Sequence, residues 1–181
     1  MLRVLLQWFL PFVGKKPMPS LTAGKIAPAV QLATTTGKVL SLHEALGKGP
    51  VLLAFFKASC PTCQYTFPYL ERIHQQLREQ GVQVWGVAQD NAQDSARFAK
   101  TYGLTFPILI DDRPCKTSRD YNLQYVPSIF LVKSDARIEI SSEGFCKADL
   151  LAIQKSLAES LSASPPALFL PSETIPEYKP G

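Results

Sequence analysis

Two cysteines separated by two residues, Cys60-Pro61-Thr62-Cys63, are the part of this sequence best suited to chemistry. Thiols at this spacing can close into a reversible disulfide, so the motif predicts a redox dithiol. The alternative is a structural zinc site, which takes four ligands and therefore needs a second close pair. The other cysteines, Cys115 and Cys146, stand alone. The pattern therefore favours redox chemistry, with no metal and no cofactor other than the disulfide itself.

The segments on either side of the dithiol place Cys60 at a strand-to-helix junction. Residues 51–56 are all apolar, which is typical of a buried strand, and residues 61–80 carry apolar side chains at helical spacing. The free amides and the dipole at a helix start stabilise an anion, so Cys60 is expected to ionise more readily than an ordinary cysteine and to be the nucleophile. Cys63, one turn into the helix, is expected to face the protein and to be the resolving thiol.

The rest of the chain alternates between predicted strands and helices, which favours an α/β fold with a central mixed sheet covered on both faces. A hairpin is expected around residues 36–38. The other predicted strands are 82–88, 106–110, 129–132 and 137–142, and the other predicted helices are 92–102, 114–121 and 147–161.

Length and composition suit one domain with extensions, because 181 residues with 46% apolar content can form one full core. We expect a domain over residues 20–161, preceded by an apolar segment and linker at 1–19. The Pro-rich tail at 162–181 is expected to be an extended strap or a disordered end. Residues 2–13 are too short to span a bilayer, which needs about 20 residues. They predict either a helix packed on the domain or a partner, or peripheral membrane contact or an export signal.

Four local motifs, at residues 24–28, 55–63, 67–70 and 126–128, resemble those of the thioredoxin-like superfamily. The likeness is greatest to its redoxin branch, which includes the AhpC/TSA antioxidant proteins and the TlpA/ResA-type thiol-disulfide reductases of cytochrome maturation. The resemblance implies an N-terminal hairpin and a redoxin-type central insertion between residues 82 and 110. It also implies that Pro127 is cis beside the dithiol and that the Val126 backbone pairs with the substrate chain. From the sequence alone, Pro127 could instead be a trans proline that begins an edge strand.

The motif around the dithiol separates two redoxin activities. Peroxide-reducing members of the family resemble one another in a Pro-x-x-x-Thr-x-x-Cys motif, and this chain has Leu53 and Lys57 where the proline and threonine would precede Cys60. The chain is therefore expected to be a thiol-disulfide oxidoreductase, with peroxide reduction through Cys60 as the alternative. A non-catalytic module that binds extended peptides, or a scaffold that docks through the chain ends, are alternatives of another class.

Proton acceptors found in related proteins are missing, because Ala54 and Thr66 occupy the positions of their acidic residues. Cys63 is therefore expected to lose its proton through water or with help from Lys57, whose ammonium could stabilise a thiolate. Pro61, Thr62, Val126 and Pro127 complete the predicted site.

The expected topology brings Cys115 and Cys146 to the sheet edge that carries the dithiol. Either cysteine could exchange with the Cys60-Cys63 disulfide as a relay, or both could be plain small hydrophobic residues.

The net charge of +4 comes from scattered basic residues, without a basic stripe, which argues against nucleic acid as a partner. His43 and His74 are expected at the surface. The expected partners are protein or small-molecule disulfides and dithiols, together with an upstream thiol reductant or oxidant. Cysteine usage leaves the compartment open between cytoplasmic and membrane-associated or periplasmic.

Overall fold

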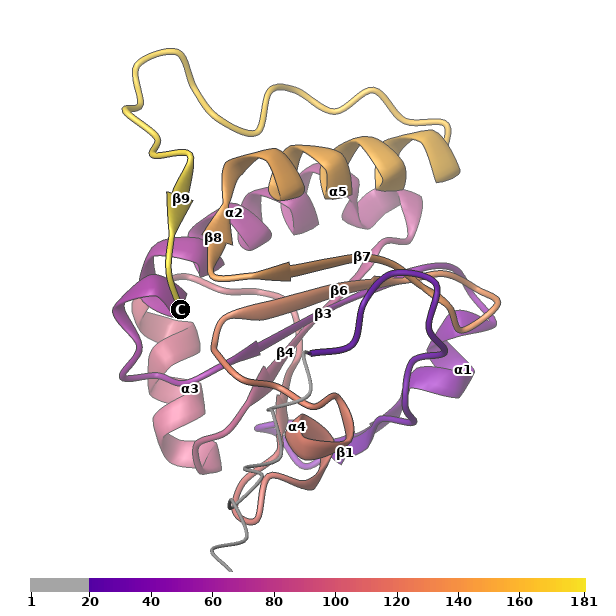
Figure 1. The fold of residues 1–181 in the computed structure, drawn as a ribbon, viewed down its shortest axis with the longest axis vertical. Helices are drawn as coiled ribbons and strands as arrows, with labels where there is room; N and C mark the ends of the chain where they lie inside the picture. Colours follow the sequence, from indigo (N-terminus) through magenta and orange to yellow (C-terminus); the bar gives the residue numbers. More distant parts are fainter. Residues whose placement is uncertain (1–19) are drawn as a thin grey trace, which may run out of the picture.

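A five-stranded mixed sheet with helices on both faces forms the centre of the computed structural model, which describes residues 20–181 (Figure 1). The strand order is β5-β4-β3-β6-β7. The strands are β3 (Val51–Phe56), β4 (Gln83–Ala88), β5 (Ile108–Ile110), β6 (Ser128–Val132) and β7 (Ile138–Glu143). β3, β4 and β5 are parallel, whereas β6 is antiparallel to β3 and to β7. The predicted mixed α/β sheet is confirmed; the apolar segment expected at residues 1–19 lies outside the described residues.

Strand β3 is buried on both sides and divides the core into two hydrophobic clusters, because successive side chains of a strand point to opposite faces. Leu52, Ala54 and Phe56 belong to the cluster shared with helices α2 (Pro61–Leu77), α3 (Ala92–Thr101) and α5 (Lys147–Ser160). The second cluster contains Val51, Leu53 and Phe55 of β3 and residues of α1 (Leu42–Leu46). It also contains Tyr121, at the end of α4 (Lys116–Asp120), and is covered by the hairpin of β1 (Gln31–Ala33) and β2 (Val39–Ser41). This central position holds the end of β3, and with it the dithiol, on a rigid support.

Helix α2 carries the dithiol at its start and packs its apolar face against the sheet. Phe67, Leu70, Ile73 and Leu77 are fully buried along it, which confirms the helical spacing seen in the sequence. Pro68 lies inside the helix, and the short 3-10 helix η1 (Arg78–Gln80) follows it.

His74 is less exposed than the sequence predicts. Its ring is half-buried and packs edge-on against Phe106, with 5.8 Å between ring centroids. Its Nδ1 atom is buried and has no hydrogen-bond partner among residues 20–181. Burial accordingly lowers the pKa of His74.

The tail at residues 162–181, called the strap below, is drawn out as an extended segment. It leaves the end of α5 and runs back over α5 and α2. It then returns to the end of the sheet where α2 begins (Figure 1). Its strand β9 (Tyr178–Lys179) pairs antiparallel with β8 (Phe145–Cys146). Neither short strand is predicted from the sequence, because two residues show no periodicity.

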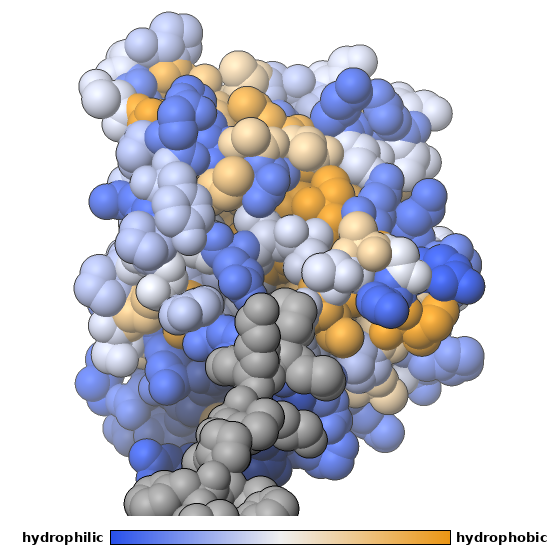
Figure 2. Space-filling model, in the orientation of Figure 1, coloured by the Kyte–Doolittle hydropathy of each residue, from blue (hydrophilic) through white to orange (hydrophobic). Residues whose placement is uncertain are grey.

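Six large apolar side chains are exposed on the described surface. On the face seen in Figure 2, apolar residues form small patches among hydrophilic ones. The exposed ones are Ile26, Val39, Tyr125, Leu151, Leu170 and Tyr178. Among the helices of residues 20–181, none combines the length and apolar character that crossing a membrane requires.

Candidate active site

Cys60 lies between the end of β3 and the first turn of α2, as the sequence predicts. It is the N-cap residue of α2, with extended backbone angles, and Pro61 follows at the first helical position. The backbone N–H of Cys63 donates to Cys60 Sγ at 3.2 Å. The Cys60 sulfur thus takes the position of a capping side chain and accepts a hydrogen bond from a free amide at the positive end of the helix.

The two thiols of the motif differ in accessibility. Cys60 is half-buried, whereas Cys63 is completely buried, and all four cysteines of the chain are free thiols. Burial raises the pKa of the Cys63 thiol well above its ordinary value, and its hydrogen bond with Cys60 raises it further. The backbone N–H of Lys57 acts in the opposite direction. An incoming disulfide can therefore reach Cys60 but not Cys63.

Beside the dithiol lies the loop that leads into β6. The Val126–Pro127 peptide bond is cis, as the family resemblance implies. The Cys60 thiol donates to the Val126 carbonyl oxygen at 3.3 Å. Two hydrogen bonds fix the loop from behind: Ser128 Oγ donates to the Tyr125 carbonyl at 2.7 Å, and the Gly144 N–H donates to the Pro127 carbonyl at 2.8 Å. Val126 and Pro127 are thus brought to Cys60.

Asp90 is a site residue that the sequence reasoning missed. It follows β4, and the parallel pairing of Phe56 with Ala88 carries it to the loop before Cys60. Its carboxylate accepts the Ala58 N–H at 2.6 Å and contributes to the raised pKa of Cys63. The sequence did contain one signal for Asp90, which is an acidic residue just after a predicted strand. Ligands and functional groups gather at the carboxyl ends of parallel strands.

The positions where related proteins carry acids are apolar or already hydrogen-bonded. Ala54 is fully buried in β3. The Thr66 hydroxyl, also fully buried, donates to the Thr62 carbonyl at 2.7 Å. The exposed Lys57 lines a cavity next to the dithiol loop together with Ser59, Asp90 and Cys115. This cavity is lined mostly by polar side chains and lies at the same end of the sheet as Cys60, where β3 and β4 finish.

The two remaining cysteines, Cys115 and Cys146, lie at the same end of the sheet as the dithiol but in different surroundings. Cys115 begins α4 with a left-handed φ of 54° and lines the cavity that contains Lys57 and Ser59. Cys146 lies in β8, where its backbone pairs with Tyr178 of the strap. Burial raises the pKa of both thiols. A relay between either cysteine and the dithiol stays a prediction.

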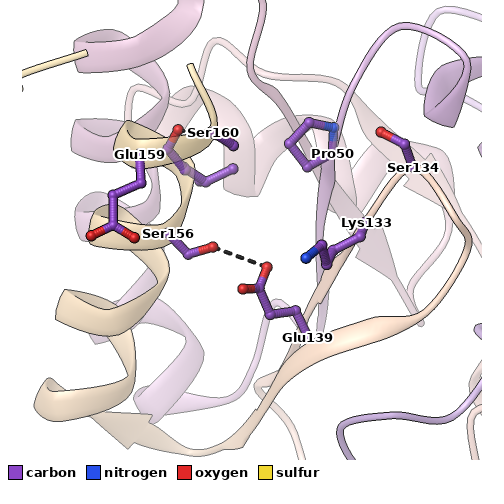
Figure 3. Close-up of a pocket in the computed structure, with 8 residues that line it drawn as sticks. Pro50, Lys133, Ser134, Glu139, Ser156, Glu159 and Ser160 are labelled. Carbon is purple, nitrogen blue, oxygen red and sulfur yellow. Dashed lines mark hydrogen bonds between the residues drawn. The ribbon is translucent and has the colours of Figure 1, made fainter. Parts of the chain in front are cut away.

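A second cleft lies at the opposite end of the sheet and contains no cysteine (Figure 3). Pro50 precedes β3 and Lys133 follows β6, so this cleft lies at the end of β3 remote from Cys60. Ser156 Oγ donates to Glu139 at 2.9 Å across it. In the part of the chain that the structure describes, no cluster of histidine, cysteine or acidic residues could hold a metal ion.

A family model described as AhpC/TSA matches residues 23–141, more than half of the chain. The chain belongs to the AhpC/TSA family. Among curated relatives, the thiol-disulfide oxidoreductase ResA of Bacillus subtilis is 31% identical over 129 residues, covering 70% of this chain and 69% of ResA. The thioredoxin-like protein YneN of Bacillus subtilis is 32% identical over 136 residues, covering 73% of this chain and 78% of YneN.

Solved structures agree with this membership. A crystal structure assigned as the thiol:disulfide interchange protein DsbE of Chlorobium tepidum aligns with a TM-score of 0.69 and 27% identity, over 78% of this chain and 99% of that chain. The thioredoxin domain of oxidoreductase BVU-2223 from Bacteroides vulgatus aligns with a TM-score of 0.67 at 24% identity, over 76% of this chain and 99% of that chain, and supports the fold. This AhpC/TSA member is therefore a thioredoxin-like thiol-disulfide oxidoreductase with a CxxC dithiol. Antioxidant peroxide chemistry fits these relatives less well.

Proposed function

We propose that Cys60 is the attacking thiol and Cys63 the resolving thiol of the exchange reaction. The observation that carries this assignment is the difference between the two sulfurs. Cys60 is half-buried, caps α2 and accepts the Cys63 N–H, whereas Cys63 is completely buried. A reactive cysteine is partly exposed near groups that stabilise its thiolate, and a buried cysteine is inert until a partner sulfur comes within reach.

The proposed cycle begins with attack of the Cys60 thiolate on one sulfur of a substrate disulfide. The substrate S–S bond breaks, a mixed disulfide with Cys60 forms, and the second substrate sulfur leaves as a thiolate that takes up a proton. Cys63 then loses its proton and attacks Cys60 Sγ. The mixed disulfide breaks, the Cys60–Cys63 disulfide forms, and the first substrate sulfur leaves. Two electrons have passed to the substrate, and an external dithiol restores the protein; the reverse sequence oxidises a substrate dithiol.

The resolving step requires an acceptor for the Cys63 proton, and we propose Asp90 in this role, acting through water. Its carboxylate is fixed on the loop before Cys60 by the Ala58 N–H. An Asp90→Asn variant keeps an oxygen that can accept from Ala58 but removes the basic carboxylate. We expect it to slow conversion of the mixed disulfide to the Cys60–Cys63 disulfide about a hundredfold, the lower end of the range for loss of a general base. Asp94→Asn, on nearby α3, is the matched control and should leave this rate unchanged.

The proposed substrates are protein or small-molecule disulfides and dithiols, served by an upstream thiol reductant or oxidant. Two features support this choice over peroxide. Lys57 and Leu53 stand where peroxide-reducing relatives place their threonine and proline. The Val126 carbonyl is hydrogen-bonded to the Cys60 thiol and belongs to a loop whose backbone could pair with an extended chain.

An equilibrium redox titration tests this function. The full chain is poised in glutathione or dithiothreitol buffers, and free thiols are alkylated and counted by mass spectrometry. We expect one two-electron couple that is lost in Cys60→Ser and Cys63→Ser and retained when Cys115 and Cys146 are both replaced by Ser. A potential near or below about −250 mV indicates a reductase, and one above about −150 mV an oxidant. Absence of a disulfide at every poise, or peroxide reduction faster than disulfide exchange, contradicts the proposal.

A further inference from the structure

The strap is held against the domain along its length rather than lying loosely on it. Leu168 is 1% exposed and packs in the same core cluster as α2 and α5. Arg72 of α2 forms two hydrogen bonds with the Glu173 carboxylate, at 2.7 and 2.6 Å, and a third with the Leu168 carbonyl at 3.1 Å. Gln154 of α5 donates to the Pro166 carbonyl at 2.9 Å. These contacts direct the last residues of the strap to one place.

That place is the end of the sheet at which β3 finishes and the dithiol lies (Figure 1). The Lys147 N–H donates to the Glu177 carbonyl at 3.0 Å, and Lys179 pairs with Phe145 in the β8–β9 ladder. The Lys179 ammonium lies 4.9 Å from the centre of the Tyr65 ring on α2. The strap therefore adds a strand beside the segment that follows β7 and reaches across to the first turns of α2.

The final two residues contact both halves of the site. The Thr62 hydroxyl, inside the dithiol motif, donates to the Pro180 carbonyl at 2.6 Å. Gly181 lies against the Val126 carbonyl, because a Cβ added to Gly181 would come within 2.7 Å of that oxygen. The same oxygen accepts from the Cys60 thiol at 3.3 Å. The strap thus touches the backbone of the loop that would hold an extended substrate.

A glycine on the domain makes room for this approach. Gly144 has a left-handed φ of 72°, and a Cβ added there would collide with the Lys179 carbonyl oxygen. Its N–H also donates to the Pro127 carbonyl at 2.8 Å. One residue therefore both fixes the cis-proline loop and admits the strap next to it.

We propose that residues 178–181 are a specificity-determining segment that occupies the docking place of an extended polypeptide substrate. The inference rests on the proposed function, because it concerns which disulfides reach Cys60. A polypeptide that pairs with the Val126 backbone must displace the strap, whose tethering gives it an effective concentration on the order of mM. A small disulfide needs only to reach Cys60, a half-buried residue. The protein with its strap in place therefore favours small or locally exposed disulfides over extended peptide disulfides.

The test compares two symmetrical disulfides, glutathione disulfide and the disulfide-linked dimer of a ten-residue peptide with one central cysteine. Rates of reaction with the reduced protein are measured for wild type, Gly181→Val and a variant lacking residues 178–181. This variant keeps Leu168, the Arg72–Glu173 pair and the Glu177 contact. Thr174→Val, at an exposed strap position, is the matched control.

We expect both strap variants to react at least fivefold faster with the peptide dimer and within twofold of wild type with glutathione disulfide, while Thr174→Val matches wild type. Unchanged peptide rates, or equal acceleration with both disulfides, would overturn the proposal. Failure of every variant to react with glutathione disulfide is a different result, because it removes the proposed function on which the inference rests.

Hydrogen exchange provides a readout that does not depend on turnover. Cys63→Ser protein is trapped as a mixed disulfide either with the peptide or with glutathione. In the peptide adduct the backbone amides of β8, which pairs with Tyr178 and Lys179, should lose protection because residues 178–181 have left β8. In the glutathione adduct their protection should be retained. Retained protection in both adducts would show that peptide and strap occupy different places, contrary to the proposal.

Discussion

Replacing Leu168 with alanine tests whether the strap is an integral part of the folded domain. Leu168 is 1% exposed in the core cluster shared with α2 and α5. Truncating a buried leucine to alanine costs about 2–5 kcal/mol, from lost transfer free energy and the cavity left behind. Because the strap can relax locally, we expect the lower part of that range, about 2–3 kcal/mol. For a protein of this size, that corresponds to a fall in Tm of roughly 4–12 °C.

The assay is urea unfolding followed by circular dichroism, with Leu170→Ala as the matched control. Leu170 lies two residues further along the same strap but is 51% exposed, so its truncation should change the free energy of unfolding by less than about 0.5 kcal/mol. If Leu168→Ala costs less than about 1 kcal/mol, or no more than Leu170→Ala, the strap detaches before the domain unfolds. The strap would then not be fixed over the site.

Three further predictions concern titration and access. The Arg72 guanidinium lowers the pKa of Glu173 to about 2 from its ordinary 4.5, so the contribution of this pair is complete above pH 4.5 and is lost as the pH falls toward 2. Hydrogen exchange checks this: strap amides of the wild type should lose protection over that pH range, and Glu173→Gln should show no such pH dependence. Burial lowers the pKa of His74, so urea midpoints of wild type should fall as the pH drops below about 6.5, and less so in His74→Gln. Iodoacetamide should label Cys60 in the folded reduced protein but Cys63 only after unfolding, because Cys63 is 0% exposed; equal labelling would contradict the assigned roles.

The sequence was sufficient for the elements that position the dithiol. A wholly apolar run predicts β3 at residues 51–56, and apolar residues at helical spacing predict α2 after it. The junction between them, with Cys60 as the N-cap, follows from those two signals. The cis bond before Pro127 came only from the family resemblance, since periodicity carries no information about a peptide isomer.

The features that the sequence did not predict depend on contacts between distant residues. Asp90 reaches the Cys60 loop because β3 and β4 pair in a particular register. His74 is half-buried because Phe106 packs on its ring. The Pro-rich composition predicts an extended strap, but its path depends on the buried Leu168 and on the Arg72–Glu173 pair. No local signal indicates which groove an extended segment will fill.

The position of Gly181 has a practical consequence for handling this protein. Gly181 lies against the Val126 carbonyl oxygen, which also accepts a hydrogen bond from the Cys60 thiol, so a residue added after Gly181 begins close to Cys60. An affinity tag fused there would begin next to the dithiol, and a histidine tract would place metal-binding imidazoles near the Cys60 sulfur. Potentials and exchange rates measured on such a fusion would describe the tag as well as the enzyme. Purification handles for kinetic work therefore belong elsewhere, or must be cleaved from this end before assay.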